Sequence, residues 1–135
     1  MLLMLIQFSV ENFLSIKEKV VLSLLASKDN EHPNHLIADE TNRYLKSAVI
    51  YGANASGKSN VLNAFWLMVN YVLTSHNQQI HKAIDLSLFK FDPETPTRPS
   101  SFEVIFTTKG IRYAYGFSVT DSAVTKEYLY YYPNG

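Results

Sequence analysis

The sequence predicts an α/β fold in which an antiparallel β-meander lies beside one glycine-loop strand and one long helix. Three observations support this fold class. Segments of alternating apolar and polar residues occupy both ends of the chain, as is typical of strands. Residues 58–75 contain neither Gly nor Pro and are almost wholly apolar, which favours a helix. The glycine-rich stretch YGANASGKSN, at 51–60, stands where a strand would pass into that helix.

The composition is typical of one soluble globular domain. The 135 residues are 47% hydrophobic and 18% charged, which provides enough apolar surface for a core. Twelve Lys and Arg balance twelve Asp and Glu, so the charge does not indicate nucleic acid, although a local basic patch stays open. The absence of Cys excludes disulfides and thiolate metal sites and favours a cytoplasmic location. The opening MLLMLI is too short for a signal sequence or a membrane span, so no membrane partner is expected.

The first half of the chain predicts a hairpin, a loop and a buried strand. Residues 4–10 alternate and predict a strand, and residues 20–26 predict a second strand that pairs with it. Residues 27–46 are polar and without a sustained period, which predicts a long surface loop. The short apolar run SAVIY, at 47–51, predicts a buried strand that leads into the glycine loop.

The helix and the meander follow. Within residues 58–75 the polar side chains Asn63, Asn70 and Thr74 share one narrow stripe, so the helix is expected to be buried on most sides. Four alternating segments separated by turn residues then predict the meander, with tight turns at Lys109-Gly110 and Asp121-Ser122. The chain is thus expected to divide into residues 1–84, with the hairpin and glycine loop, and residues 85–135, with the meander.

The glycine-rich stretch matches the phosphate-loop pattern Gly-x-x-x-x-Gly-Lys-[Ser/Thr] at Gly52, Gly57, Lys58 and Ser59. In such a loop, backbone N–H groups and the start of the following helix bind an anion. The two glycines permit the loop conformation and the close approach of phosphates. Lys58 supplies charge to the β- and γ-phosphates, and the Ser59 hydroxyl is a Mg²⁺ ligand. A lysine at the start of a helix is repelled by the positive end of the helix dipole. Its presence therefore favours a loop that binds an anion over a turn that is only exposed to water.

Two stretches carry a family resemblance, MLIQFSVENFLSIKEKVVLSL at 4–24 and VIYGANASGKSNVLNAF at 49–65. They resemble the N-terminal lobe of ABC-type ATPases of the SMC, RecF and OLD-like branch. Within that branch the chain is similar to the AAA-family ATP-binding proteins of bacterial phage-defence and abortive-infection operons. That closer likeness extends over FKFDPETPTRPSSFEVIF, at 89–106, and YAYGF, at 113–117.

The resemblance implies a P-loop NTPase fold of the ABC/SMC-like kind and an ATPase that uses ATP and Mg²⁺. It implies that Asn54 faces the γ-phosphate and that Ser15, in the N-F-x-S turn, lies near the nucleotide. Leu14 of that turn stands where many relatives have a basic residue. The residues expected to bind the nucleotide are therefore Gly52, Ala53, Asn54, Ala55, Ser56, Gly57, Lys58, Ser59, Asn60 and Ser15, with Ser59 also binding Mg²⁺.

The resemblance further implies a C-terminal lobe with Walker B carboxylates and a signature loop, and a head-to-tail homodimer formed on ATP. An operon-encoded effector or nuclease is a further expected partner. Neither the carboxylates nor the signature is readable after Ser59. We therefore expect a partial domain that binds ATP without hydrolysing it alone, and we assign no catalytic residue. LIADE, at 36–40, and Gln78-Gln79 imitate a Walker B strand and a glutamine loop, but their places in the chain argue against both roles.

Two other functions stay open, a small P-loop kinase and a β-rich interaction module with a fortuitous motif. The kinase is disfavoured because about fifty residues precede the loop and no Arg-rich lid follows it. Tyr44 is a candidate for stacking on an adenine. Base stacking on the strand tyrosines is also open, although a packed sheet face is favoured. These aromatic residues are Tyr113, Tyr115 and Phe117 on one strand and Tyr128, Tyr130 and Tyr132 on the next.

Overall fold

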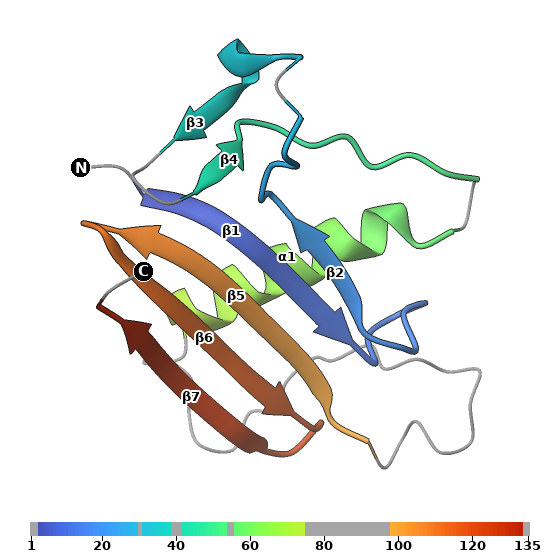
Figure 1. The fold of residues 1–135 in the computed structure, drawn as a ribbon. Coiled ribbons are helices and arrows are strands. Elements are labelled where there is room, and N and C mark those ends of the chain that lie inside the picture. Colours follow the sequence, from blue (N-terminus) through green and yellow to red (C-terminus); the bar gives the residue numbers. More distant parts are fainter. Residues whose placement is uncertain (1–2, 30, 39–41, 54–55, 75–97, 134–135) are drawn as a thin grey trace.

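The structure is a computed structural model that describes residues 3–29, 31–38, 42–53, 56–74 and 98–133 (Figure 1). A five-stranded antiparallel sheet in the order β2-β1-β5-β6-β7 forms the body of the domain. One helix, α1 (Lys58–Thr74), crosses behind this sheet in Figure 1. The α/β class, the long helix and the antiparallel meander agree with the sequence prediction. None of the described helices is long and apolar enough to cross a membrane.

The predicted hairpin is present as β1 (Leu3–Glu11) and β2 (Val20–Ser23), which pair antiparallel. The turn after β1 is closed by two backbone hydrogen bonds, from Phe13 N–H to Ile16 O at 2.9 Å and from Ile16 N–H to Phe13 O at 2.8 Å. Leu14 and Ser15 are therefore the two turn residues. Leu14 has a φ of 51°, in the left-handed region that a bulky side chain rarely adopts.

The meander is present as β5 (Ser100–Thr108), β6 (Ile111–Val119) and β7 (Val124–Tyr132). Lys109 and Gly110 have φ values of 54° and 73°, which is the conformation of the tight hairpin turn that the sequence predicts. The second predicted turn, at Asp121-Ser122, is closed by a hydrogen bond from Thr120 N–H to Ala123 O at 2.8 Å. The first predicted segment of the meander, residues 84–91, lies outside the described residues.

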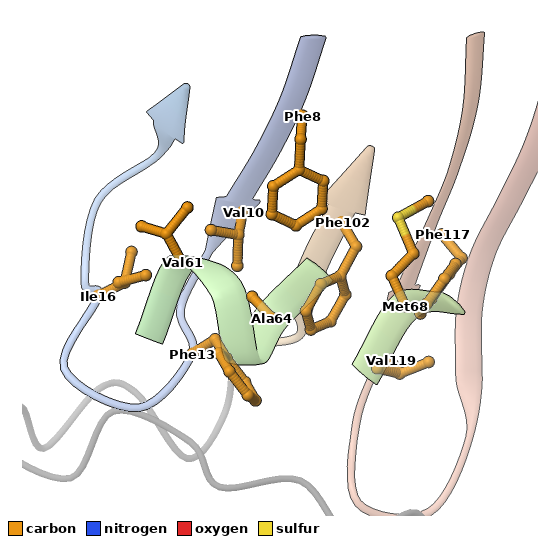
Figure 2. Close-up of a cluster of buried hydrophobic side chains, with 10 residues drawn as sticks. All are labelled: Phe8, Val10, Phe13, Ile16, Val61, Ala64, Met68, Phe102, Phe117 and Val119. Carbon is orange, nitrogen blue, oxygen red and sulfur yellow. The ribbon is translucent and has the colours of Figure 1, made fainter. Parts of the chain in front are cut away.

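The hairpin and the meander form one sheet, because β1 pairs along its length with β5. Alternate residues of β1, β5 and β6 therefore point to a common face, and α1 packs against that face. Phe8, Phe102 and Phe117 are each no more than 2% exposed, and the ring centroids of Phe102 and Phe117 lie 5.3 Å apart. Figure 2 shows how the buried side chains gather between α1 and the strands: Phe8, Val10, Phe13, Ile16, Val61, Ala64, Met68, Phe102, Phe117 and Val119.

The prediction of a buried strand at 47–51 is wrong. These residues form no strand, and their side chains are exposed, with Val49 at 84% and Tyr51 at 90%. A buried parallel strand needs backbone partners on its flanks and side-chain cover on both faces. The described part of the chain provides no strand that pairs with this run, so its apolar residues remain uncovered.

The prediction of a long loop at 27–46 is wrong in its second half. A short helical turn, η1 (Pro33–His35), precedes a two-stranded sheet of β3 (Leu36–Ala38) and β4 (Arg43–Leu45). Backbone hydrogen bonds from Ala26 N–H to Arg43 O at 2.9 Å and from Leu45 N–H to Leu24 O at 2.7 Å attach β4 to the chain beyond β2. Strands of three residues are too short to show a period in the sequence.

The helix is confirmed at Lys58–Thr74, but the expectation that it is buried on most sides is wrong. Its buried residues are Val61, Ala64 and Met68, which follow the spacing of one helical face. A second apolar stripe on the helix is exposed to solvent. Its members are Leu62 at 60%, Trp66 at 67%, Val69 at 41% and Leu73 at 65%. The sequence shows that both stripes are apolar, and only one of them is covered by the sheet.

Candidate functional site

The glycine loop ends where α1 begins. A hydrogen bond from Ser56 N–H to Ala53 O, at 3.2 Å, closes a turn within the loop, and α1 starts at Lys58. The N–H groups of a first helical turn have no partners within the helix, and no acidic residue stands in the first turn of α1 to occupy them. The loop therefore lies at the positive end of the helix dipole. Asn54 and Ala55, two of the predicted binding residues, lie outside the described residues.

The two glycines of the motif are required by the surroundings of the loop. Gly57 has a φ of 90°, which is a strained conformation for any other residue, and a Cβ there would lie 3.1 Å from Ser15 Oγ. A Cβ on Gly52 would lie 3.1 Å from Ser56 Oγ. A side chain at either position would therefore push against a neighbouring hydroxyl. The space beside the backbone is kept open by the absence of these Cβ atoms.

Lys58 bends back over the loop that precedes it. Its Nζ donates hydrogen bonds to Gly52 O at 2.8 Å and to Ala53 O at 2.6 Å, and it lies 3.5 Å from Ser56 Oγ. The ammonium charge is thus held by backbone carbonyl dipoles. Because these hydrogen bonds are exposed to solvent, the ammonium can exchange a carbonyl for a phosphate oxygen at small cost.

The turn between β1 and β2 touches the start of α1. Asn60 Nδ2 donates a hydrogen bond to Ser15 Oγ at 2.7 Å, and Asn63 Nδ2 approaches Asn60 Oδ1 at 3.4 Å. In the first of these bonds Ser15 Oγ is the acceptor, so its own hydrogen is left to donate to another group. The structure therefore brings Ser15, Gly57 and Asn60 together at the mouth of the loop.

Ser59 lies on the first turn of α1 and is exposed. Within the described ranges, no group of three or more His, Cys, Asp or Glu is arranged to hold a metal ion. A hydroxyl oxygen is a suitable ligand for Mg²⁺, which commonly takes few protein ligands and completes its shell with water and phosphate oxygens. Ser59 is thus chemically suited to a metal that arrives with a nucleotide.

One residue that the sequence analysis missed holds the Ser15 turn in place. Asn12 is 2% exposed and has a φ of 54°. Its side-chain amide donates to Arg98 O at 2.8 Å, and its backbone oxygen accepts a hydrogen bond from the Ser100 hydroxyl. These bonds fix the end of β1 to the start of β5. Asparagine tolerates a left-handed conformation, which is the only local signal that the sequence contains.

The structure does not place the other predicted features in this site. Tyr44 is 2% exposed, so the proposal that it stacks on an adenine is wrong. It belongs to β4, and its backbone forms a bridge with Leu25. Asp39 and Glu40 of the LIADE segment, and Gln78 and Gln79, lie outside the described residues.

A glycine loop that meets a lysine at the start of a helix, beside a mixed α/β core, defines a P-loop type of nucleotide-binding domain. A family model described as "AAA domain, putative AbiEii toxin, Type IV TA system" matches residues 47–135, and the chain belongs to this family. The matched residues include the glycine loop, α1 and the meander, whereas the β1–β2 hairpin precedes them. No curated protein matches the chain.

Proposed function

We propose that this domain binds Mg-ATP through residues 52–60 and Ser15, as the nucleotide-binding part of an ABC/SMC-like ATPase. The position of Lys58 is the observation that carries the proposal. Its ammonium lies over a loop in which a Cβ on either glycine would crowd a neighbouring hydroxyl, at the start of a helix without acidic residues. A cation at that end of a helix is unfavourable alone and becomes favourable beside a bound anion.

In this proposal each residue of the site makes a different contact with Mg-ATP. Lys58 pairs with the terminal phosphates, and the backbone of Gly57 approaches them closely because no side chain intervenes. Ser15 donates its free hydroxyl hydrogen to a nucleotide oxygen, while Asn60 holds the Ser15 oxygen in place. Asn54 faces the γ-phosphate, as the ABC/SMC resemblance implies, and Ser59 provides the ligand to Mg²⁺. Bound Mg²⁺ supplies charge neutralisation for the phosphates.

Calorimetric titration with nucleotide and Mg²⁺ tests the proposed function directly. Recognition is expected to depend on the phosphates, because nothing in the chain resembles the Asn-Lys-x-Asp motif of guanine-specific sites. We expect ATP to give a saturable binding heat and GTP to compete no better than ATP. Absence of heat with Mg-ATP would favour the β-rich interaction module, and a clear preference for GTP would place the protein in another class.

Replacing Ser59 by Ala is expected to reduce the dependence of ATP binding on Mg²⁺. The substitution removes one oxygen ligand and no charge, so affinity in the absence of Mg²⁺ should stay unchanged. The ratio of the ATP dissociation constants with and without Mg²⁺ measures the effect. Ser47→Ala is the matched control, because Ser47 is also an exposed serine but lies outside the proposed binding residues. An unchanged ratio in Ser59→Ala would show that Ser59 is not a metal ligand.

Hydrolysis requires more than the glycine loop, because a metal must be held from a second side and a group must orient the attacking water. We propose that a C-terminal lobe supplies Walker B carboxylates and that a head-to-tail second subunit supplies the signature loop. The exposed apolar residues of α1 and of 47–51 support a covering lobe, since uncovered apolar surface of this extent is unusual.

We expect the 135-residue chain alone to release phosphate from ATP only at background rate. We also propose that an effector encoded in the same operon is a partner of this protein. The protein would then act in bacterial defence in the cytoplasm.

A further inference from the structure

The face of the sheet opposite α1 carries a row of tyrosines along its edge. We call this the outer face. The register of β7 places Tyr128, Tyr130 and Tyr132 opposite Gly116, Ala114 and Arg112 of β6, on the side away from the core residue Phe117. Gly116 and Ala114 are small, so the rings of Tyr128 and Tyr130 have no large β6 side chain directly opposite them. Tyr130 is 54% exposed and Tyr132 is 48% exposed.

Tyr128 is fixed across the sheet and forms the base of this row. Its hydroxyl donates to Glu103 Oε2 at 2.6 Å, which places the ring over Gly116. A Cβ on Gly116 would clash with the Tyr128 hydroxyl, so only glycine permits this arrangement. Burial, and then the hydrogen bond to Glu103, raises the pKa of Tyr128 and keeps it a donor. The ring of Tyr130 stacks on that of Tyr128, with centroids 5.1 Å apart and planes 29° apart.

The charges of the outer face leave an excess of positive charge beside the tyrosines. Glu11 is paired with Arg98 at 2.7 Å, and Glu103 accepts from Tyr128 and lies 3.9 Å from Lys19. Lys126 lies 5.1 Å from the centroid of the Tyr128 ring. Neither Lys126 nor Arg112 forms a salt bridge within the described part of the chain. Arg112 Nε is buried without a hydrogen-bond partner there.

The centre of the outer face is polar, which disfavours packing of an apolar protein surface. The Ser101 and Ser118 hydroxyls lie 2.8 Å apart between β5 and β6. They border a hollow of about 120 Å³ that Tyr128, the cations Lys19 and Lys126 and the carboxylates Glu11 and Glu103 also line, and both carboxylates are already paired with other groups. Exposed aromatic rings lie here beside hydroxyls and beside cations that form no salt bridge with a described residue, and this combination matches a ligand with flat apolar rings and negative charge.

We propose that the outer face binds single-stranded nucleic acid, with bases stacked on Tyr130 and Tyr132 and phosphates paired with Lys126 and Arg112. Side chains on one face of a strand repeat about every 6.7 Å, which is about twice the thickness of a stacked base. Tyr130 already stacks on Tyr128, so the place for a base with contact on both sides is between Tyr130 and Tyr132. Stacking on an aromatic ring is possible for every base, so we expect little preference for sequence. The phosphate contacts should make the affinity depend strongly on salt concentration.

Fluorescence anisotropy with a labelled oligothymidylate of about 15 nucleotides tests this site, at the upper end of the lengths that such surfaces cover. The doubly substituted Tyr130→Ala, Tyr132→Ala protein should bind at least about tenfold more weakly. Tyr131→Ala is the matched control, because Tyr131 is 66% exposed on the opposite face of the same strand. Replacing both Tyr130 and Tyr132 by Phe should retain binding, which separates loss of stacking from loss of folding.

Lys126→Ala combined with Arg112→Ala should lower the slope of log affinity against log salt by about 1.4, since each removed phosphate contact contributes about 0.7 for a single strand. All titrations are made without nucleotide and repeated in Lys58→Ala, so their outcome is independent of ATP binding. No binding by the unaltered chain, equal loss in Tyr131→Ala, or preference for a duplex of the same length would each overturn the proposal.

Discussion

Replacing Lys58 by Ala is expected to weaken Mg-ATP binding at least tenfold, about 1.4 kcal/mol, with little effect on folding. The ammonium now bonds to Gly52 O and Ala53 O, which water can solvate in its absence because both bonds are exposed. With a bound phosphate, the ammonium forms charge-assisted hydrogen bonds that are stronger than those a water molecule in its place would form. Isothermal titration with Mg-ATP measures the affinity, and thermal unfolding without nucleotide measures the stability.

Lys46→Ala is the matched control for this experiment. Lys46 Nζ also donates to a backbone carbonyl, Asn34 O, at 2.7 Å on the surface, but it follows β4 and lies outside the glycine loop. Both variants lose one positive charge, so a general effect of net charge on ATP affinity would appear in both. Equal affinity of Lys58→Ala and the unaltered chain would refute the proposed phosphate site.

The sequence predicted those elements whose pattern is long enough to be periodic. The strands β1, β5, β6 and β7 are each nine residues long and α1 has seventeen residues, so each shows several repeats of its period. The short strands β3 and β4 show none. The run at 47–51 is apolar enough for a strand, but strand formation depends on partners that a local pattern cannot reveal.

The candidate site was predictable where its residues form a motif and unpredictable where they depend on distant contacts. Gly57 and Lys58 belong to a contiguous pattern with a known physical purpose. The role of Asn12 depends on the carbonyl of Arg98, 86 residues later in the chain. No local property of an asparagine at the end of a strand indicates that partner. The contact between Asn60 and Ser15, 45 residues apart, was likewise visible only in the fold.

Replacing Phe102 by Ala is expected to lower the free energy of unfolding by about 3–5 kcal/mol, the range for large-to-small changes of aromatic core residues. Phe102 is 2% exposed and stacks on Phe117, so its removal leaves a cavity between β5, β6 and α1. Domains have a total stability of about 5–15 kcal/mol, and the loss is a large part of it. Urea denaturation, followed by circular dichroism, measures the change.

The same substitution links the core to the candidate site. The Phe102 ring contacts Phe13 edge-on, with centroids 5.6 Å apart, and Phe13 leads directly into the Leu14-Ser15 turn. Loss of that support should let Ser15 move away from Asn60 and weaken Mg-ATP binding even where the chain is still folded. Leu129→Ala, at a residue of the same sheet that is 61% exposed, should change the stability by no more than about 0.5 kcal/mol and leave the affinity unchanged. A Phe102→Ala protein that is destabilised but binds Mg-ATP with full affinity would show that this part of the core does not hold Ser15 in the nucleotide site.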